Sequence, residues 1–294
     1  MVVNKKVKSP WKNAHSLKPH SVSLKKKPRI KRQVNNLEVK SPEISVNIIA
    51  RNEEKLIVDC LISARLLADE IIFIDMESDD NTKKVAGKYA DKIYSFPRVG
   101  YVEPARNFGI KKCSGDWIFI LDADERITPQ LAREIRQAIV SCSPNVGAFT
   151  IPRANYNFGV WLRHGGWWPD YQVRLLRKKS FLDWPKAIHS FPEIKGRKEK
   201  LNNPFNHLAN ETIEEMLEKT INYSQQEVKL FDKGGIKSNF WMLIKKPIGE
   251  FFRRGIRERG FLDGTAGLIQ VIYQSFSVFI TYARLWEKQT KNKK

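Results

Sequence analysis

The most constraining feature of this chain is a short apolar run that stops abruptly at a group of acids. Residues 117–121 (WIFIL) have the composition of a fully buried strand, and Asp122, Asp124 and Glu125 follow almost at once. These acids could simply cap the next helix, as acids in an ordinary surface turn do. Carboxylates that share the end of a buried strand, however, are costly unless a cation neutralises them. A divalent metal with oxygen ligands, completed by a bound diphosphate, would fit this pattern.

Similar apolar runs occur elsewhere in the chain and alternate with segments of helical periodicity. This alternation is typical of an α/β fold with a mostly parallel, Rossmann-like sheet that helices cover on both faces. The predicted elements are, in order, a strand at 44–50, a helix at 53–67, a strand at 70–74, a helix at 80–89, a strand at 92–96, a helix at 102–112, a strand at 116–121, a helix that begins at Thr128 and Pro129, and a strand at 147–152.

Polar residues follow three of the predicted strands at the point where each strand ends. Arg51 and Glu53 follow the first strand, Asp75 follows the second, and Asp122 and Asp124 follow the fourth. In open α/β sheets, ligands bind beyond the carboxyl ends of the strands. We therefore expect these side chains to line one ligand-binding edge of the sheet.

The chain is strongly basic, with a formal net charge of +20, and such a charge favours an anionic partner. Much of this charge lies in residues 1–42, which contain twelve Lys or Arg and one acid and show no periodicity. We predict that residues 1–42 form a disordered basic tail, that residues 43–207 form the catalytic domain, and that residues 208–294 form a helical region.

Several classes of protein are disfavoured by composition. The three cysteines, Cys60, Cys113 and Cys142, are far apart and include no Cys-x-x-Cys pair, so neither a zinc site nor a disulfide framework is expected. A reducing compartment fits this cysteine content best. The N-terminus shows no apolar signal-peptide stretch, and no uninterrupted apolar run of about 20 residues predicts a spanning helix.

Four segments together resemble the family-2 glycosyltransferases of the nucleotide-diphospho-sugar transferase fold, called GT-A. None is specific alone, but their order and separations resemble the family over roughly residues 43–205. The resemblance implies a GT-A fold, here with a C-terminal helical extension. The segments are IIARNEE at 48–54, the D-x-x-S-x-D-x-T pattern that begins at Asp75, ARNFGI at 105–110, and GDWIFILDADE at 115–125.

The resemblance also implies a nucleotide-sugar donor, a UDP-sugar in our expectation, bound with Mg²⁺ or Mn²⁺. As a Lewis acid, the metal would hold charge on the departing nucleoside diphosphate. By this resemblance, Ala50, Arg51 and Glu53 would border the nucleotide base, and Asp75 would bind the base or the ribose. Arg106 would contact the nucleotide or its phosphates. Asp122 would approach the ribose and the metal, and Asp124 would be the main protein ligand of the metal.

The segment HGGWWPDYQVRLLRK, at 164–178, is similar to a subgroup typified by bacterial lipopolysaccharide-core β-glucosyltransferases. This similarity makes Asp170 the candidate general base toward the acceptor hydroxyl, although a plain turn residue after a proline is an equal alternative. Trp167 and Trp168 could stack on a sugar or belong to the core. His189 could contact the metal or diphosphate or be structural, and His207 matches a second histidine of the subgroup.

The C-terminal region combines basic, aromatic and apolar residues. Residues 245–259 carry six Lys or Arg beside aromatic and aliphatic side chains, and residues 263–288 show one narrow polar stripe on an apolar helix. This pattern favours an interfacial membrane anchor. The alternative is a helix that packs on the catalytic core or on a second subunit.

The resemblance implies an inverting glycosyltransferase that moves a hexose, glucose in our expectation, to a lipid-linked glycan such as lipopolysaccharide core. It would be cytoplasmic and peripheral on the inner membrane.

One rival hypothesis is a nucleic-acid-binding protein that uses KKKPRIKR at 25–32. A basic tail without interleaved aromatics gives affinity but no specificity, and it leaves the strand-end acids unexplained, so nucleic acid is disfavoured. An inactive scaffold of the same fold is a third reading.

Overall fold

A computed structural model describes residues 33–34, 37–38, 42–99, 101–186 and 190–291. Most of the predicted tail therefore lies outside the described residues, although two short strands in it, β1 (Gln33–Val34) and β2 (Leu37–Glu38), pair antiparallel. The chain divides into two compact units. The first reaches Ile151 and includes Gln172–Phe205, and the second comprises Pro152–Tyr171 and Asn206–Lys294. The domain boundaries at 42/43 and 207/208 remain predictions.

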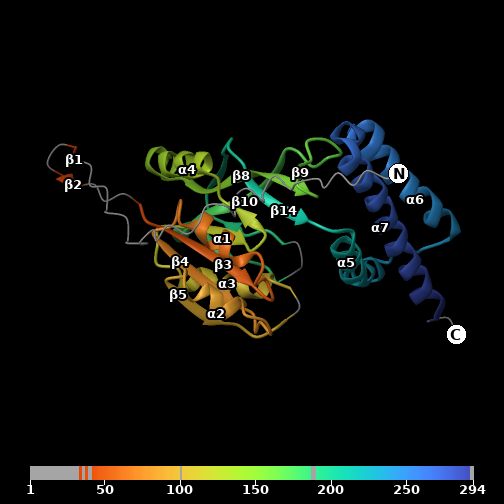
Figure 1. The fold of residues 1–294 in the computed structure, drawn as a ribbon, viewed down its shortest axis with the longest axis horizontal. Helices are drawn as coiled ribbons and strands as arrows, with labels where there is room; N and C mark the ends of the chain where they lie inside the picture. The colour runs from red at the N-terminus through yellow and green to blue at the C-terminus, as the bar shows by residue number, and fades with distance from the viewer. Residues whose placement is uncertain (1–32, 35–36, 39–41, 100, 187–189, 292–294) are drawn as a thin grey trace, which may run out of the picture. The chain divides into compact units, whose positions relative to one another are not determined.

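Four parallel strands form the centre of the first unit in the order β5-β4-β3-β6, which confirms the α/β reading (Figure 1). Along each strand the side chains alternate between two buried clusters, because successive residues point to opposite faces of a sheet. Val46, Ile48 and Phe119 belong to one cluster, and Ile49 and Ile120 belong to the other. The bounds are Ile44–Ala50 for β3, Glu70–Asp75 for β4, Lys92–Ser95 for β5 and Trp117–Asp122 for β6.

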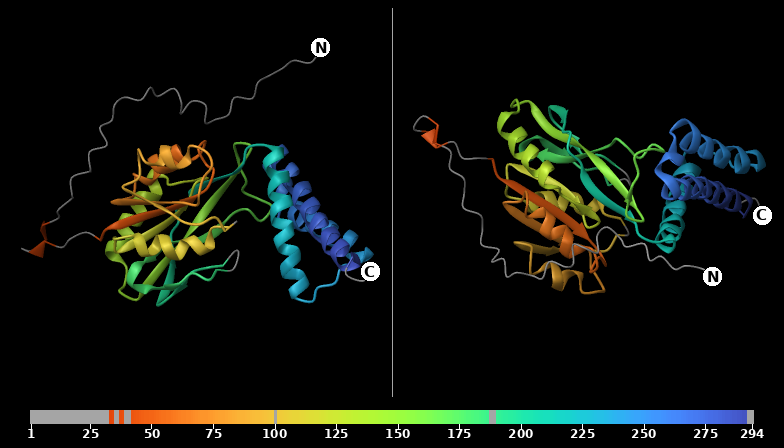
Figure 2. Two further views of the ribbon diagram at one scale, coloured as in Figure 1. Left: turned by 90° about the horizontal axis from the view of Figure 1, so that it is seen from below. Right: turned by 45° about the horizontal axis from the view of Figure 1, so that its top comes forward.

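Helices cover both faces of this sheet (Figure 2). Residues of α1, α2 and α4 belong to one cluster, and residues of α3 belong to the other. The predicted start of α4 is confirmed, since the Thr128 hydroxyl accepts the backbone N–H of Leu131 and Pro129 opens the helix. The bounds are Ile57–Ala64 for α1, Thr82–Ala86 for α2, Glu103–Lys112 for α3 and Pro129–Ser141 for α4.

Beyond β6 the sheet becomes mixed. Strand β10 (Asp170–Arg177) pairs antiparallel with β6, and β8 (Val146–Asn157) is next to β10 in the strand order. Strand β8 continues well past the predicted end at 152. The remaining strands are Glu125–Arg126 for β7, Val160–Trp161 for β9, Phe181–Asp183 for β11, Glu193–Ile194 for β12, Arg197–Lys200 for β13 and Phe205–Asn210 for β14.

The C-terminal part of the second unit is helical, as predicted, and consists of α5 (Ile213–Lys233), α6 (Phe240–Phe252) and α7 (Gly264–Lys291). A π-helical segment (Arg253–Arg257) and a 3₁₀ segment (Gly260–Asp263) join α6 to α7. Among the described residues, one helical stretch, Gly260–Lys291, is long and apolar enough to cross a membrane by length and composition.

The predicted polar stripe on α7 packs against α5. Thr281 is buried and donates to Glu227, and the Arg284 guanidinium donates to the Ile221 carbonyl at 2.7 Å. Helix α7 therefore packs on another helix of its own region, α5, which neither interpretation of the stripe named, and membrane association of the region remains a prediction.

Candidate active site

The register of the central strands brings the predicted acids to one edge of the sheet. Ala50, at the end of β3, lies opposite Asp75 of β4, and Ile49 lies opposite Asp122 of β6. Asp75 and Asp122 therefore flank the carboxyl end of β3, although they are distant in sequence. This is the edge at which ligands bind in sheets of this kind.

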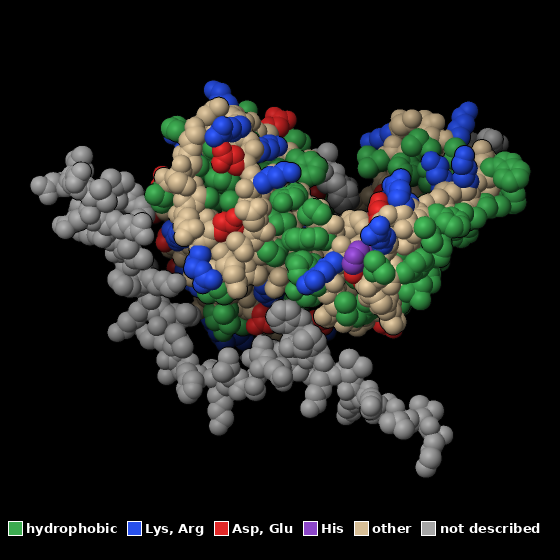
Figure 3. Space-filling model, turned by 90° about the horizontal axis from the view of Figure 1, so that it is seen from above, with side chains coloured by type: hydrophobic (Ala, Val, Ile, Leu, Met, Phe, Trp, Pro, Cys, Tyr) green, Lys and Arg blue, Asp and Glu red, His purple; other side chains and the backbone are tan. Residues whose placement is uncertain are grey.

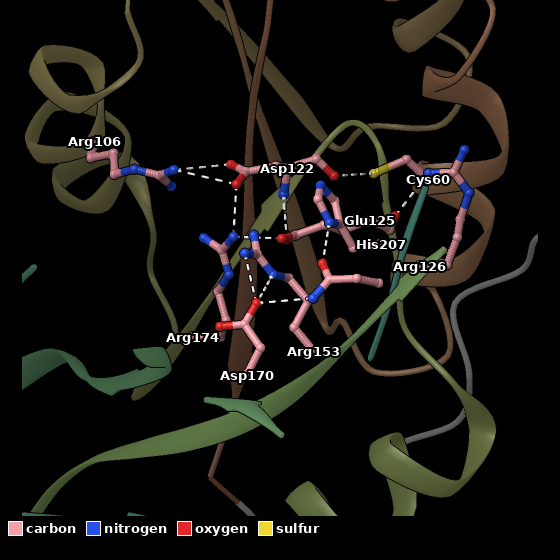
Figure 4. Close-up of polar contacts among 10 residues, drawn as sticks. Cys60, Arg106, Asp122, Glu125, Arg126, Arg153, Asp170, Arg174 and His207 are labelled. Carbon is pink, nitrogen blue, oxygen red and sulfur yellow. Dashed lines mark hydrogen bonds and ion pairs between the residues drawn. The ribbon is translucent and has the colours of Figure 1, made fainter. Parts of the chain in front are cut away.

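Asp122 lies between two arginines (Figure 4). Its Oδ1 accepts from Nη2 of Arg106 at 3.0 Å, and its Oδ2 accepts from Nη2 of Arg174 at 2.8 Å. Burial alone would raise the pKa of the Asp122 carboxyl, but Arg106 and Arg174 outweigh it and hold this pKa well below its usual range. Asp122 is thus an ionised group whose charge is already paired within the protein.

The turn that follows Asp122 is fixed from several sides. Glu125 is fully buried, accepts the backbone N–H of Asp122 at 3.1 Å and also pairs with Arg174. The Arg126 guanidinium donates to the Ala123 carbonyl at 2.7 Å and to the Leu56 carbonyl at 2.9 Å. Asp124, which the turn carries, is half-buried. A fixed turn pre-organises Asp124, because little conformational freedom remains to be lost on binding.

Asp75 is a buried carboxylate with spare hydrogen-bonding capacity. The residue is 2% exposed, and its Oδ2 has a long contact of 3.4 Å with the backbone N–H of Ser78. Its Oδ1 is buried and has no hydrogen-bond partner among the described residues. Buried acceptors are normally satisfied, so this oxygen indicates a missing donor such as a ligand N–H or O–H.

The loops next to Asp75 are tied together. Arg51 forms an ion pair with Asp79, and the backbone N–H of Glu53 donates to the Thr82 hydroxyl at 2.7 Å. Ala50, which is 4% exposed, is the last residue of the adjacent strand, β3. The structure therefore places Ala50 opposite Asp75 and joins Arg51 and Glu53 to the segment that follows Asp75, and their predicted place at the border of a nucleotide base remains a prediction.

Arg106 is buried on the first turns of α3 and lies over the Trp184 ring, with 4.8 Å from its guanidinium carbon to the ring centroid. Its Nη2 contacts Asp122, whereas Nε and Nη1 have no hydrogen-bond partner within the described part of the chain. Two N–H-bearing nitrogens in a buried guanidinium suit an anionic ligand such as a phosphate.

Comparison with known proteins identifies the family. The family model described as "Glycosyl transferase family 2" matches residues 45–202, which span all the strand-end residues described above. The chain belongs to glycosyl transferase family 2. The same comparison confirms that this is an enzyme family with glycosyl-transfer activity.

Relatives of this family-2 glycosyltransferase include bacterial proteins of similar length. An uncharacterized glycosyltransferase of Rickettsia conorii is 26% identical over 85% of the chain and 92% of its own length. The lipopolysaccharide core biosynthesis glycosyltransferase LpsC of Rhizobium meliloti is 26% identical over 83% of the chain and 92% of its own length. Among solved structures, the mannosyltransferase PcManGT of Pyrobaculum calidifontis, in complex with GDP-Man and Mn²⁺, matches with a TM-score of 0.50 and 14% identity over 85% of this chain and 89% of its own. This match confirms the GT-A fold.

The predicted base of this glycosyltransferase, Asp170, opens β10 in the second unit. Its Oδ2 accepts from Nε of Arg153 at 2.8 Å and from the amide of Asn155 at 3.1 Å (Figure 4). Asn155 is fully buried, and its Oδ1 lies 2.7 Å from Nδ1 of His207. Asp170 is therefore a member of a polar network, and its role as a general base remains a prediction.

The loop that leads to Asp170, residues 163–170, is held by the C-terminal segments of the same unit. Asp263 accepts the backbone N–H groups of Arg163 and His164, and its other oxygen lies 2.7 Å from Nδ1 of His164. The Arg254 guanidinium donates to the Gly165 carbonyl at 2.8 Å and lies over the Trp167 ring. We call residues 163–170 the acceptor-side loop.

The predicted metal ligands fit a divalent ion that also binds phosphate oxygens. Within the described residues, no three His, Cys, Asp or Glu side chains form a metal-binding group. Asp122 is paired with two arginines, and the role of Asp124 as the metal ligand, which the resemblance implies, remains a prediction. One carboxylate plus substrate phosphates is a common arrangement for Mg²⁺. His189 lies outside the described residues.

Several residues of the site were not among the candidates selected from the sequence. Glu125 and Arg174 complete the Asp122 cluster, Arg153 and Asn155 hold Asp170, and Trp184 lies under Arg106. Arg174 falls in the 164–178 segment that carries the resemblance, and a search for buried partners of the strand-end acids could have selected it. Glu125 is one of the acids that follow the buried strand and lies in the 115–125 segment, whereas Arg153, Asn155 and Trp184 lie outside the segments that carry the resemblance.

Proposed function

We propose that this enzyme is a metal-dependent, inverting glycosyltransferase that transfers a hexose from a nucleoside-diphosphate sugar to a lipid-linked glycan. Asp75 carries the donor part of the proposal, because its buried Oδ1 lacks a partner at the sheet edge where the family model matches. A base N–H or a ribose O–H would satisfy this oxygen. Ala50, Arg51 and Glu53 would border the base.

Diphosphate recognition would rest on Arg106 and Asp124. The free N–H groups of Arg106 would donate to phosphate oxygens, while Asp122, already neutralised, would orient Arg106 and approach the ribose. Asp124 would bind Mn²⁺ or Mg²⁺. The metal would neutralise the negative charge on the departing nucleoside diphosphate. A mannosyltransferase of the same fold contains GDP-Man and Mn²⁺, which supports a nucleotide sugar with a divalent metal.

Asp170 would act as the general base in a single displacement. It would take the proton of the acceptor hydroxyl as that oxygen bonds to the anomeric carbon, while the bond from this carbon to the diphosphate oxygen breaks. Arg153 and Asn155 hold Oδ2 of the carboxylate, and this orientation is what positioned proton transfer needs. One displacement inverts the anomeric centre.

The acceptor and donor classes follow from relatives. LpsC, which covers most of the chain, acts in lipopolysaccharide core biosynthesis, and this supports a lipid-linked acceptor at the cytoplasmic face of the inner membrane. The similarity of residues 164–178 to lipopolysaccharide-core β-glucosyltransferases supports glucose and a UDP donor.

A transfer assay tests this function. Radiolabelled nucleotide sugars, UDP-glucose among them, are incubated with the enzyme, Mn²⁺ and lipid-linked core acceptors, and the label in the lipid fraction is counted. We expect incorporation by the wild type and at least a roughly 100-fold loss in Asp170→Asn. Asp59→Asn, the same change at an exposed position on α1, serves as the control. Incorporation by Asp170→Asn at the wild-type rate would refute the assignment of the base.

A further inference from the structure

Helix α6 presents a continuous apolar face outside its own unit's packing. None of its residues is buried, and five apolar side chains are exposed: Phe240 (65%), Trp241 (74%), Ile244 (40%), Ile248 (50%) and Phe252 (57%). Four of these recur at every fourth position, which places them on one side of a helix. A soluble monomer rarely leaves such a contiguous face uncovered.

The opposite side of α6 is held within the unit. The helix packs along α7, and the Lys246 ammonium lies 5.8 Å from the centroid of the Tyr282 ring. Just before α6, the Ser238 hydroxyl donates to the Tyr282 carbonyl at 2.9 Å. The apolar face is therefore presented by a helix whose position in the unit is fixed.

Positive charge surrounds this face. Lys245 and Lys246 are exposed on α6, and Arg257 and Arg259 are exposed just beyond it. The neighbouring acid Glu250 is engaged by Arg253 and Arg254. In Figure 3, basic side chains lie among hydrophobic ones on the surface of the part that holds α6 and α7.

The apolar surface continues beyond the helix. Ile256, at 59% exposure, lies in the π-helical segment, and Leu262, at 65%, lies in the 3₁₀ segment before α7. This apolar surface, with basic residues beside it, has the composition of a helix that lies in the plane of a membrane interface.

We propose that the outer face of α6 docks on the surface of an anionic lipid bilayer. Trp241, Ile248 and Phe252 would enter the interface, and Lys245 and the exposed Arg257 would contact anionic headgroups. Charge complementarity favours this occupant over a second copy of the chain, because a second copy would bring like charge to the same face. This inference rests on the proposed function, which includes a lipid-linked acceptor. It adds the surface by which the enzyme would reach that acceptor at the membrane.

The first experiment measures vesicle binding. Full-length enzyme is floated with vesicles of phosphatidylcholine alone or with phosphatidylglycerol, at low and high salt. We expect binding to anionic vesicles that falls at least about tenfold in Trp241→Ser/Phe252→Ser and in Lys245→Glu/Arg257→Glu. Ile62→Ser/Val140→Ser, which replaces exposed apolar residues of the other unit, should bind like the wild type. Equal binding by all variants would overturn the proposal.

A second measurement separates insertion of α6 into the bilayer from electrostatic attraction of the basic N-terminal segment to anionic lipids. High salt should screen that attraction. Brominated lipids quench tryptophans that enter the interface, so we expect quenching at high salt that Trp241→Phe largely removes. Unchanged quenching in Trp241→Phe, or a lipid-free dimer that Trp241→Ser dissociates, would overturn the proposal. Nucleotide-sugar hydrolysis without lipid, measured on the same samples, reports separately on the proposed function.

Discussion

Arg174 compensates a fully buried acid, Glu125, and a half-buried one, Asp122, at once. Its guanidinium pairs with Asp122 and Glu125, and all three groups lie in the first unit at the carboxyl edge of the sheet. Asp122 and Asp75 thus differ in kind, although both are acids at neighbouring strand ends. Asp122 is neutralised by the protein, whereas Asp75 keeps a buried oxygen without a partner among the described residues.

Removal of Arg174 should therefore be severe. In Arg174→Ala the carboxylates of Asp122 and Glu125 lose a buried partner, and we expect the free energy of unfolding to fall by about 3–5 kcal/mol in urea titrations. Lys291→Ala, which breaks the exposed pair with Glu287, should cost less than about 1 kcal/mol. Similar losses of unfolding free energy in the two variants would contradict the interpretation that Arg174 compensates the charges of Asp122 and Glu125.

Asp75 should matter for binding more than for stability. In Asp75→Asn one carboxylate oxygen becomes an amide donor, so we expect nucleoside-diphosphate affinity to fall about tenfold, since a hydrogen bond to a charged group contributes about 1.5–3 kcal/mol. Calorimetric titration measures this affinity. The exposed Asp59→Asn on α1 is the matched control, and equal affinities in the wild type and Asp75→Asn would remove Asp75 from the site.

At the scale of elements, Glu70 joins three pieces of the first unit. At the start of β4, it accepts from the Ser45 hydroxyl at 2.7 Å, from the Ser114 backbone N–H at 2.8 Å and from Lys92 at 2.8 Å. Burial would raise the pKa of Glu70, but these hydrogen bonds outweigh it and lower this pKa from 4.5 to about 2.

A lowered pKa gives a stability contribution that is present above the unfolded-state pKa and lost as pH falls. Glu70→Gln should therefore be less stable than the wild type near neutral pH, and the difference should shrink as pH falls from about 4.5 toward about 2. Urea titrations across this range measure it. A difference that stays constant with pH would show that Glu70 does not titrate in this way.

The acceptor-side loop depends on the segment before α7. Asp263→Asn weakens the bonds to Arg163 and His164, so we expect the KM for the acceptor to rise about tenfold while donor hydrolysis stays unchanged. Asp232→Asn, which weakens the exposed pair with Lys288, is the control. If Asp263→Asn lowers donor hydrolysis and acceptor transfer equally, the residue has only a general structural role.

For the whole molecule, apolar patterning predicted the elements but not the long-range contacts. Strand β6 and the N-cap Thr128 follow from local sequence, because burial and capping depend on neighbouring residues. Helix α1 begins at Ile57 rather than at 53, and the Glu53 N–H bonds to Thr82 at the start of α2, a contact that no local pattern indicates. The pairing of Asp122 with Arg174 joins positions 52 residues apart, and no local pattern encodes it.

The most direct test of the account is calorimetric titration of UDP and GDP into the enzyme, with and without Mn²⁺, in the wild type and in Asp124→Asn. We predict that one nucleotide binds the wild type at least about tenfold more tightly with Mn²⁺, and that Asp124→Asn loses this gain because the metal loses its protein carboxylate. If neither nucleotide binds, or if Mn²⁺ has an equal effect on the wild type and Asp124→Asn, the result would contradict a donor-binding site formed by the acids at the carboxyl ends of the strands.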